Sequence, residues 1–317
     1  MINFAFRALP VVIFFSSLIS IAYHFGIIQI VVKWVAKLME KSMKTSGAET
    51  LSISANIFVG QTEAPILIRP YIKNMTTSEL MAIMTGGFAT VAGSVLALYV
   101  LWLEKIPGIA GHMLAASIMS APASLVIAKL IYPETEKTNS LDELNLHIEK
   151  NTTNAMDALG NGATQGLKLA ANIGAMLIAF ISILSMINFT LEHFLNINLQ
   201  EILGIIFSPL AWTMGIPWKE ANIVGRLMGE KIVLTELIAY GSLGDLINNN
   251  LISERSAIIS SYALCGFANF GSIGIQLGGI GAMAPEKRNI LSKIVLKAMV
   301  GGALASWLTA TIAGILI

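Results

Sequence analysis

The chain has 317 residues, of which 55% are hydrophobic and only 12% are charged, and its mean hydropathy is +0.72. Soluble domains carry about 25% charged residues, so this composition excludes an ordinary soluble globular protein. The formal net charge of +1 excludes the basic field that nucleic-acid binding needs. The single cysteine, Cys265, excludes an internal disulfide, and the sequence offers no metal or redox motif.

Six stretches without Asp, Glu, Lys or Arg are long enough to cross a bilayer, which takes roughly 20 mainly apolar residues. They are residues 8–32, 80–103, 106–128, 169–191, 256–285 and 298–317. This pattern predicts an all-α polytopic membrane protein.

The basic residues predict an orientation. If the six spans alternate in direction, one face receives residues 33–79, 129–168 and 286–297, which hold 14 of the 20 Lys and Arg residues. Cytoplasmic loops carry an excess of basic residues, so this face is predicted to be cytoplasmic and both termini to lie outside. The polar stretch 133–162 is then a cytoplasmic linker between two halves.

The two halves, residues 1–132 and 163–317, show the same order of elements. Each begins with one clean span, continues with a moderately apolar segment that carries charges, and ends with two more clean spans. The charged segments, residues 46–76 and 200–245, are predicted to be re-entrant hairpins whose arms are too short to span. Three crossings per half reverse the second half, which is typical of an inverted-topology repeat.

A glycine-containing stretch occurs at equivalent places in the two halves. Residues 87–94 (GFATVAGS) resemble residues 266–272 (GFANFGS). Glycine permits non-helical backbone, and Thr90, Asn269 and Ser272 offer polar groups to freed backbone or to a ligand. Inside a membrane, irregular backbone is tolerated only where protein or a cavity surrounds it. The pairing favours broken helices at a site over the alternative, close packing of intact helices.

Each predicted hairpin holds one glutamate in an otherwise apolar run. These are Glu63 in the first hairpin and Glu236 in the second. An ionised carboxylate in hydrocarbon costs about 2 kcal/mol or more, so both are candidates for a functional site. The alternative is a structural ion pair with Arg69, Arg226 or Lys231.

Three long motifs follow one another along the chain. They are residues 56–65 (NIFVGQTEAP), 229–240 (GEKIVLTELIAY) and 265–273 (CGFANFGSI). Together they resemble the signatures of the concentrative nucleoside transporter family, and the resemblance extends from about Phe4 to the C-terminus. It is to the bacterial, sodium-coupled type. It implies nucleoside import by sodium symport and alternating access, through a homotrimer in the inner membrane.

The resemblance also implies that the nucleoside lies between two hairpin tips and two unwound helices. The residues expected at the nucleobase are Gln61, Thr62, Glu63 and Val95. Those expected at the ribose are Glu236, Asn269 and Ser272, with Phe267 as an apolar wall. A carboxylate can accept from two hydroxyls and an amide both donates and accepts, so these residue types suit a sugar.

A sodium ion is the one coupling ligand that the resemblance implies, and no other cofactor is expected. The matching groups are the Asn56 side chain, the Thr90 hydroxyl and carbonyl, and the carbonyls of Val59 and Val91. Neutral oxygens at a half-helix end suit a monovalent cation that must be released again. Proton-coupled bacterial relatives tend to lack the asparagine, so Asn56 favours sodium over the alternative of proton coupling.

Two features depart from the family pattern. Thr235 and Leu237 flank Glu236 where the family usually has Asn and Phe, so substrate affinity or range is expected to differ. The family normally has further spans before the position of Phe4, which leaves a truncated, non-transporting membrane subunit as an alternative. A third possibility is an intramembrane enzyme with Glu63 and Glu236 as a carboxylate pair, but no nucleophile or metal set accompanies them.

Overall fold

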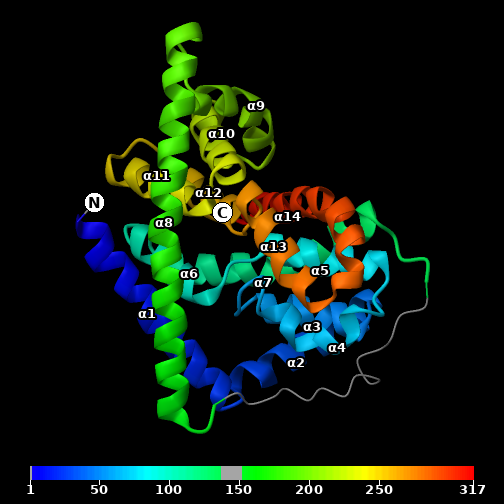
Figure 1. The fold of residues 1–317 in the computed structure, drawn as a ribbon. Helices are drawn as coiled ribbons and strands as arrows, with labels where there is room; N and C mark the ends of the chain where they lie inside the picture. Colours follow the sequence, from blue (N-terminus) through cyan, green and yellow to red (C-terminus); the bar gives the residue numbers. More distant parts are fainter. Residues whose placement is uncertain (1, 137–151) are drawn as a thin grey trace.

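The computed structural model describes residues 2–136 and 152–317 (Figure 1). Within these residues all regular secondary structure is helical, which confirms the predicted all-α class. The first part comprises α1 (Ile2–His24), α2 (Ile27–Met43), α3 (Gly47–Asn56), η1 (Ala64–Ile68), α4 (Arg69–Ile72), α5 (Thr77–Ala89), α6 (Gly93–Trp102) and α7 (Ile109–Ile131). The second comprises α8 (Ala155–Leu195), α9 (Leu199–Thr213), α10 (Trp218–Val233), α11 (Glu236–Asn248), α12 (Glu254–Leu264), α13 (Phe270–Met283), η3 (Pro285–Lys287) and α14 (Arg288–Leu316).

Several of these helices are suited to a bilayer by length and composition. Among the described residues, three helical segments can cross one, or up to five if each of two bent pairs counts as a span. The three are Thr77–Trp102, Ile109–Ile131 and Pro285–Leu316. This confirms a polytopic membrane protein, while the inverted relation between the halves stays a prediction.

The predicted first span, residues 8–32, is divided between two helices. α1 ends at His24, Gly26 adopts the left-handed conformation with φ of 80°, and α2 leaves at an angle of 75° to the end of α1. α2 is amphipathic: it buries Val32, Ala36 and Met39 and carries lysines on its other side. Such amphipathicity is typical of a helix at a membrane surface, and the charge-free length of residues 8–32 does not predict the bend.

The predicted second hairpin, residues 200–245, also differs in detail, because it contains two turns. α9 and α10 form an antiparallel pair joined at residues 214–217, where Gly215 has φ of +95°. The pair is so close that a Cβ on Gly225 would lie 2.6 Å from the Gly204 carbonyl oxygen. A second turn at residues 234–235 then leads into α11, so Glu236 is the first residue of a helix.

Both predicted glycine stretches contain a break between helices. α5 ends at Ala89 and α6 begins at Gly93, while α12 ends at Leu264 and α13 begins at Phe270. The two breaks touch each other through Gly266, which has φ of +114°. A Cβ there would lie 2.7 Å from the carbonyl oxygens of Phe88 and Ala89, so only glycine fits.

α8 is the longest described helix and runs the full height of the view in Figure 1, alongside the other helices. α1 crosses it, and Gly162 and Gly166 let the two backbones approach: a Cβ on either would lie 2.7 Å from a Cα atom of α1. Small residues at such spacing permit close helix contact in membranes. The other face of α8 exposes large apolar side chains such as Phe189 and Phe194.

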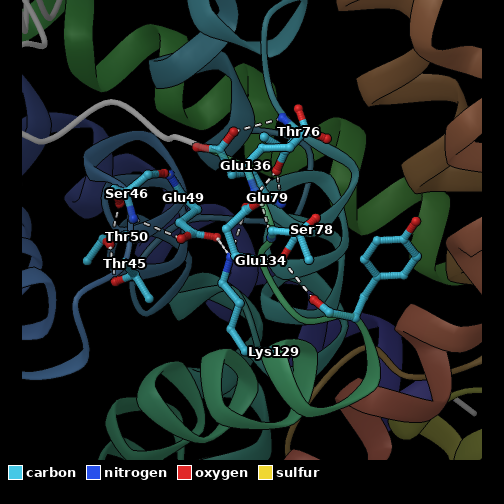
Figure 2. Close-up of polar contacts among 12 residues, drawn as sticks. Thr45, Ser46, Glu49, Thr50, Thr76, Ser78, Glu79, Lys129, Glu134 and Glu136 are labelled. Carbon is cyan, nitrogen blue, oxygen red and sulfur yellow. Dashed lines mark hydrogen bonds and ion pairs between the residues drawn. The ribbon is translucent and has the colours of Figure 1, made fainter.

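The starts of α3 and α5 are tied to the end of α7 by a polar cluster (Figure 2). Lys129 of α7 forms ion pairs with Glu49, at 2.7 Å, and with Glu134, at 3.7 Å. Glu49 completes the capping box of α3, and the Thr76 hydroxyl, which caps α5, donates to Glu134. Glu134 opens the predicted linker 133–162, of which residues 137–151 lie outside the described residues; α8 begins at Ala155.

Candidate functional site

A cavity of about 610 Å³ lies between the two halves of the chain. Its walls come from α1, the turn after α3, the start of α6, one face of α8, the start of α11 and the second helix break. All eight residues expected at the nucleoside line it: Gln61, Thr62, Glu63, Val95, Glu236, Phe267, Asn269 and Ser272. Both segments that are predicted to be hairpins and both breaks between helices therefore converge on one space.

Glu236 is the most enclosed acidic group of this cavity, with 5% of its surface exposed. It begins α11, whose N-cap Thr235 accepts a hydrogen bond from the Ile238 backbone N–H. The Tyr99 hydroxyl donates to Oε1 at 3.1 Å, and the Asn269 amide donates to Oε2 at 2.8 Å. The carboxylate is therefore held by two neutral donors and keeps acceptor capacity toward the cavity.

Asn269 has a fixed orientation because it serves two partners. It is the N-cap of α13, and its Oδ1 accepts from the Ser272 backbone N–H at 2.8 Å. Its Nδ2 is consequently the atom that donates to Glu236. The cap that begins α13 after the second break therefore also places this amide beside the Glu236 carboxylate.

A second polar group links the first hairpin to the second broken helix. Gln61 donates from Nε2 to the Ser272 hydroxyl at 3.2 Å. Its Oε1 accepts from Gln276 Nε2 at 3.0 Å, and Gln276 also donates to the Met84 carbonyl at 3.1 Å. Gly87 makes room for this arrangement, since a Cβ there would lie 2.7 Å from Gln276 Nε2.

The remaining predicted residues complete the walls. Glu63 is exposed to the cavity, and its Oε2 accepts from the Gly60 backbone N–H at 3.1 Å. Neither Glu63 nor Glu236 has a Lys, Arg or His nitrogen within 4.0 Å in the described part of the chain, so the structural ion pair is not observed. Val95 is buried and Phe267 is half-buried, which gives the space its apolar sides.

The residues expected at sodium lie beside the first break. Asn56 is the last residue of α3, is completely buried, and neither polar atom of its amide has a hydrogen-bond partner. Thr90 is the first residue after α5, and its hydroxyl donates to the Gly86 carbonyl at 2.9 Å. Val59 lines the cavity and Val91 is buried. The Gly93 backbone N–H donates to the Phe58 carbonyl at 3.1 Å, which joins the hairpin turn to the break.

Tyr99 and Gln276 are site residues that sequence reasoning did not identify. Tyr99 stacks on Tyr240 with ring centroids 4.0 Å apart, and Tyr240 is itself held by a hydrogen bond to the Ser261 carbonyl. Tyr99 and Gln276 are both polar side chains in charge-free stretches, and this pattern indicates candidate site residues. Their partners, however, are far away in the sequence.

Comparison with known proteins finds matches in both halves of the chain. A family model described as "Na+ dependent nucleoside transporter C-terminus" matches residues 112–314, and one described as "Nucleoside recognition" matches residues 5–105. The nucleoside permease NupC of Helicobacter pylori is 41% identical, and the match covers 99% of this chain and 76% of that protein. The sodium/nucleoside cotransporter 1 of Mus musculus is 42% identical, and the match covers 99% of this chain and 51% of that protein.

Solved structures give the same result for the fold. The structure of CNTnw in an inward-facing substrate-bound state is 43% identical and superposes with a TM-score of 0.90, covering 98% of this chain and 74% of that one. A CNTnw variant in an outward-facing state also superposes with a TM-score of 0.90.

Proposed function

Because this chain belongs to the concentrative nucleoside transporter family, we propose that it imports nucleosides by sodium symport and alternating access. Members of this family are transporters, not enzymes. We place it as a homotrimer in the bacterial inner membrane, with both termini outside.

One observation carries the substrate assignment. Glu236, Asn269 and Ser272 lie on one side of a single cavity and Gln61, bonded to Ser272, reaches it from the other hairpin. The carboxylate and the amide suit the two ribose hydroxyls, which donate and accept. Gln61 and Thr62, with Glu63 beside them, suit the polar edge of the nucleobase. Val95 and Phe267 offer apolar surface to the ring faces.

Asn56 carries the sodium assignment. A buried amide with both atoms unpartnered is costly, by about 1–3 kcal/mol for each group, unless a ligand completes it. It lies at the end of α3 beside the break after α5, where helix-end carbonyls point without helical partners. With the carbonyls of Val59, Thr90 and Val91, it forms a set of neutral oxygens suited to a monovalent cation.

We infer an order of events that agrees with these contacts. Sodium binds between the first hairpin turn and the first break and fixes the turn that presents Gln61 and Thr62. The nucleoside then joins this turn to Glu236 of the second hairpin. The loaded pair of hairpins moves between the two faces as one unit, and the first ligand improves the binding of the second.

Uptake by proteoliposomes tests this function. Labelled uridine is expected to accumulate under an inward sodium gradient, and Glu236→Gln is expected to abolish accumulation. Glu254→Gln is the matched control, because Glu254 is also the first residue of its helix but is exposed. Uptake that follows a proton gradient without sodium would replace sodium by protons. Binding without uptake would favour a non-transporting subunit.

A further inference from the structure

Lys231 is a basic residue in the interior of the protein, and it is not part of the proposed nucleoside site. It lies in the last turn of α10, is completely buried, and does not line the cavity. A lysine in this position is costly unless its ammonium has specific partners.

The ammonium of Lys231 contacts backbone carbonyls rather than a carboxylate. Nζ donates to the Ala263 carbonyl at 3.0 Å and to the Cys265 carbonyl at 3.2 Å. No Asp or Glu oxygen lies within 4.0 Å of it in the described part of the chain, although its charge and that of Glu236 interact at longer range. A structural ion pair therefore does not account for it.

These two carbonyls lie at the C-terminal end of α12, where the second break begins. α12 ends at Leu264, and the C-terminus of a helix carries a partial negative charge of roughly half an electron. The neighbouring Ser261 carbonyl accepts from the Tyr240 hydroxyl, a neutral donor. Lys231 supplies the positive charge that this half-helix end attracts inside the membrane.

The first break has a corresponding end without such a charge. α5 ends at Ala89 against Gly266 of the second break, so the two C-terminal ends meet. Among the described residues, no Lys or Arg donates to a carbonyl in the last turn of α5. The residue of the preceding segment that lies near this end of α5 is Asn56, whose amide has no hydrogen-bond partner. One break thus has a lysine where the other has an open set of neutral oxygens.

We propose that the Lys231 ammonium is a tethered cation, which does at the second break what a bound monovalent cation does at the first. The inference rests on the proposed sodium symport. It means that the chain carries a fixed positive charge in place of a second coupling ion, and that one sodium ion is coupled to each nucleoside. The tethered charge also stabilises the second break while the first awaits its ion.

The test removes the tethered cation and asks whether a free one replaces it. Lys231→Asn shortens the side chain, so it leaves room beside the two carbonyls and adds a neutral amide oxygen on that side. Lys231→Met removes the charge but fills the space. Lys219→Asn is the matched control, since Lys219 is on the same helix but exposed. Sodium-dependent uridine uptake is measured for each in proteoliposomes.

We expect the wild type and Lys219→Asn to show a Hill coefficient for sodium of about 1. Lys231→Asn should need a higher sodium concentration and show a coefficient approaching about 2, the number of sites. Lys231→Met should lose uptake by about tenfold or more at every sodium concentration. An unchanged sodium curve for Lys231→Asn would overturn the inference.

A stability measurement tests the tethered cation independently of nucleoside transport. The melting temperature of detergent-solubilised protein is compared in sodium chloride and in N-methyl-D-glucamine chloride, whose cation is too large to enter. Lys231→Asn should be stabilised by sodium by several degrees more than the wild type. This holds even if the wild type takes up no uridine. Equal sodium effects in the two proteins would contradict the tethered cation whatever the transport result.

Discussion

The Asn269 amide donates to the Glu236 carboxylate at 2.8 Å, and it does so while capping the helix that follows the second break. The same residue therefore holds the broken helix in shape and orients the acidic group. Loss of the carboxylate partner would leave an amide buried without its bond, and loss of the amide would leave a buried carboxylate with one donor fewer. Shape and binding chemistry are coupled at this contact.

Tyr99→Phe should weaken nucleoside binding without unfolding the protein. The change removes the donor to Glu236 Oε1 but keeps the ring that stacks on Tyr240. A hydrogen bond to a charged group contributes about 1.5–3 kcal/mol, so the affinity for uridine should fall about 10- to 150-fold. Calorimetric titration with uridine and a thermal melt measure the two effects. An unchanged affinity would mean that Tyr99 does not hold the carboxylate.

Gly87→Ala should disturb the link between Gln61 and Gln276. The added methyl group would lie 2.7 Å from Gln276 Nε2 and 3.2 Å from Gln61 Cβ. Relief of such a clash costs about 1–3 kcal/mol, so both the melting temperature and the affinity for uridine should fall.

Gly111→Ala is the control for this change. Gly111 lies in α7, and a Cβ there meets no atom within 4 Å. Alanine is favoured over glycine inside a helix by about 0.5–1 kcal/mol, so this variant should be as stable as the wild type or more so. Equal effects of the two substitutions would show that the contact at Gly87 is not the cause.

The sequence identified the site where polar residues interrupt apolar runs, as at Glu236 and Asn269. It missed Tyr99 and Gln276 because their partners lie 137 and 215 positions away, and only the folded chain brings them together. The bend at Gly26 was missed for another reason. Charge-free length predicts whether a segment can enter a bilayer, but one residue in the left-handed conformation decides whether it continues straight.

Asn56→Ala should remove sodium binding while sparing the ion-free protein. Neither amide atom has a partner, so its removal costs the ion-free state no hydrogen bond. We expect the half-saturating sodium concentration for uptake to rise about tenfold or more, and the stabilisation by sodium to disappear. Ser54→Ala, on the same helix but bonded to the Met39 sulfur, is the control and should keep both. A normal sodium response in Asn56→Ala would move the ion elsewhere.

Glu134→Gln should lower stability in a way that depends on pH. Burial alone would raise the pKa of the Glu134 carboxyl, but hydrogen bonds from the Thr76 hydroxyl and the Glu136 backbone N–H, together with Lys129, hold that pKa below its usual value (Figure 2). A carboxyl with a lowered pKa in the folded state stabilises the protein fully above its unfolded pKa, about 4.3. This stabilisation is lost as the pH falls through the folded pKa.

The melting temperature of the Glu134→Gln variant should therefore lie a few degrees below that of the wild type at pH 7, and the difference should shrink as the pH falls below about 4. Glu136→Gln is the matched control, because the Glu136 side chain is exposed two residues further on. Its melting curve should follow that of the wild type at every pH. A Glu134→Gln deficit that persists unchanged in acid would mean that the ionised carboxylate is not what joins the starts of α3 and α5 to the end of α7.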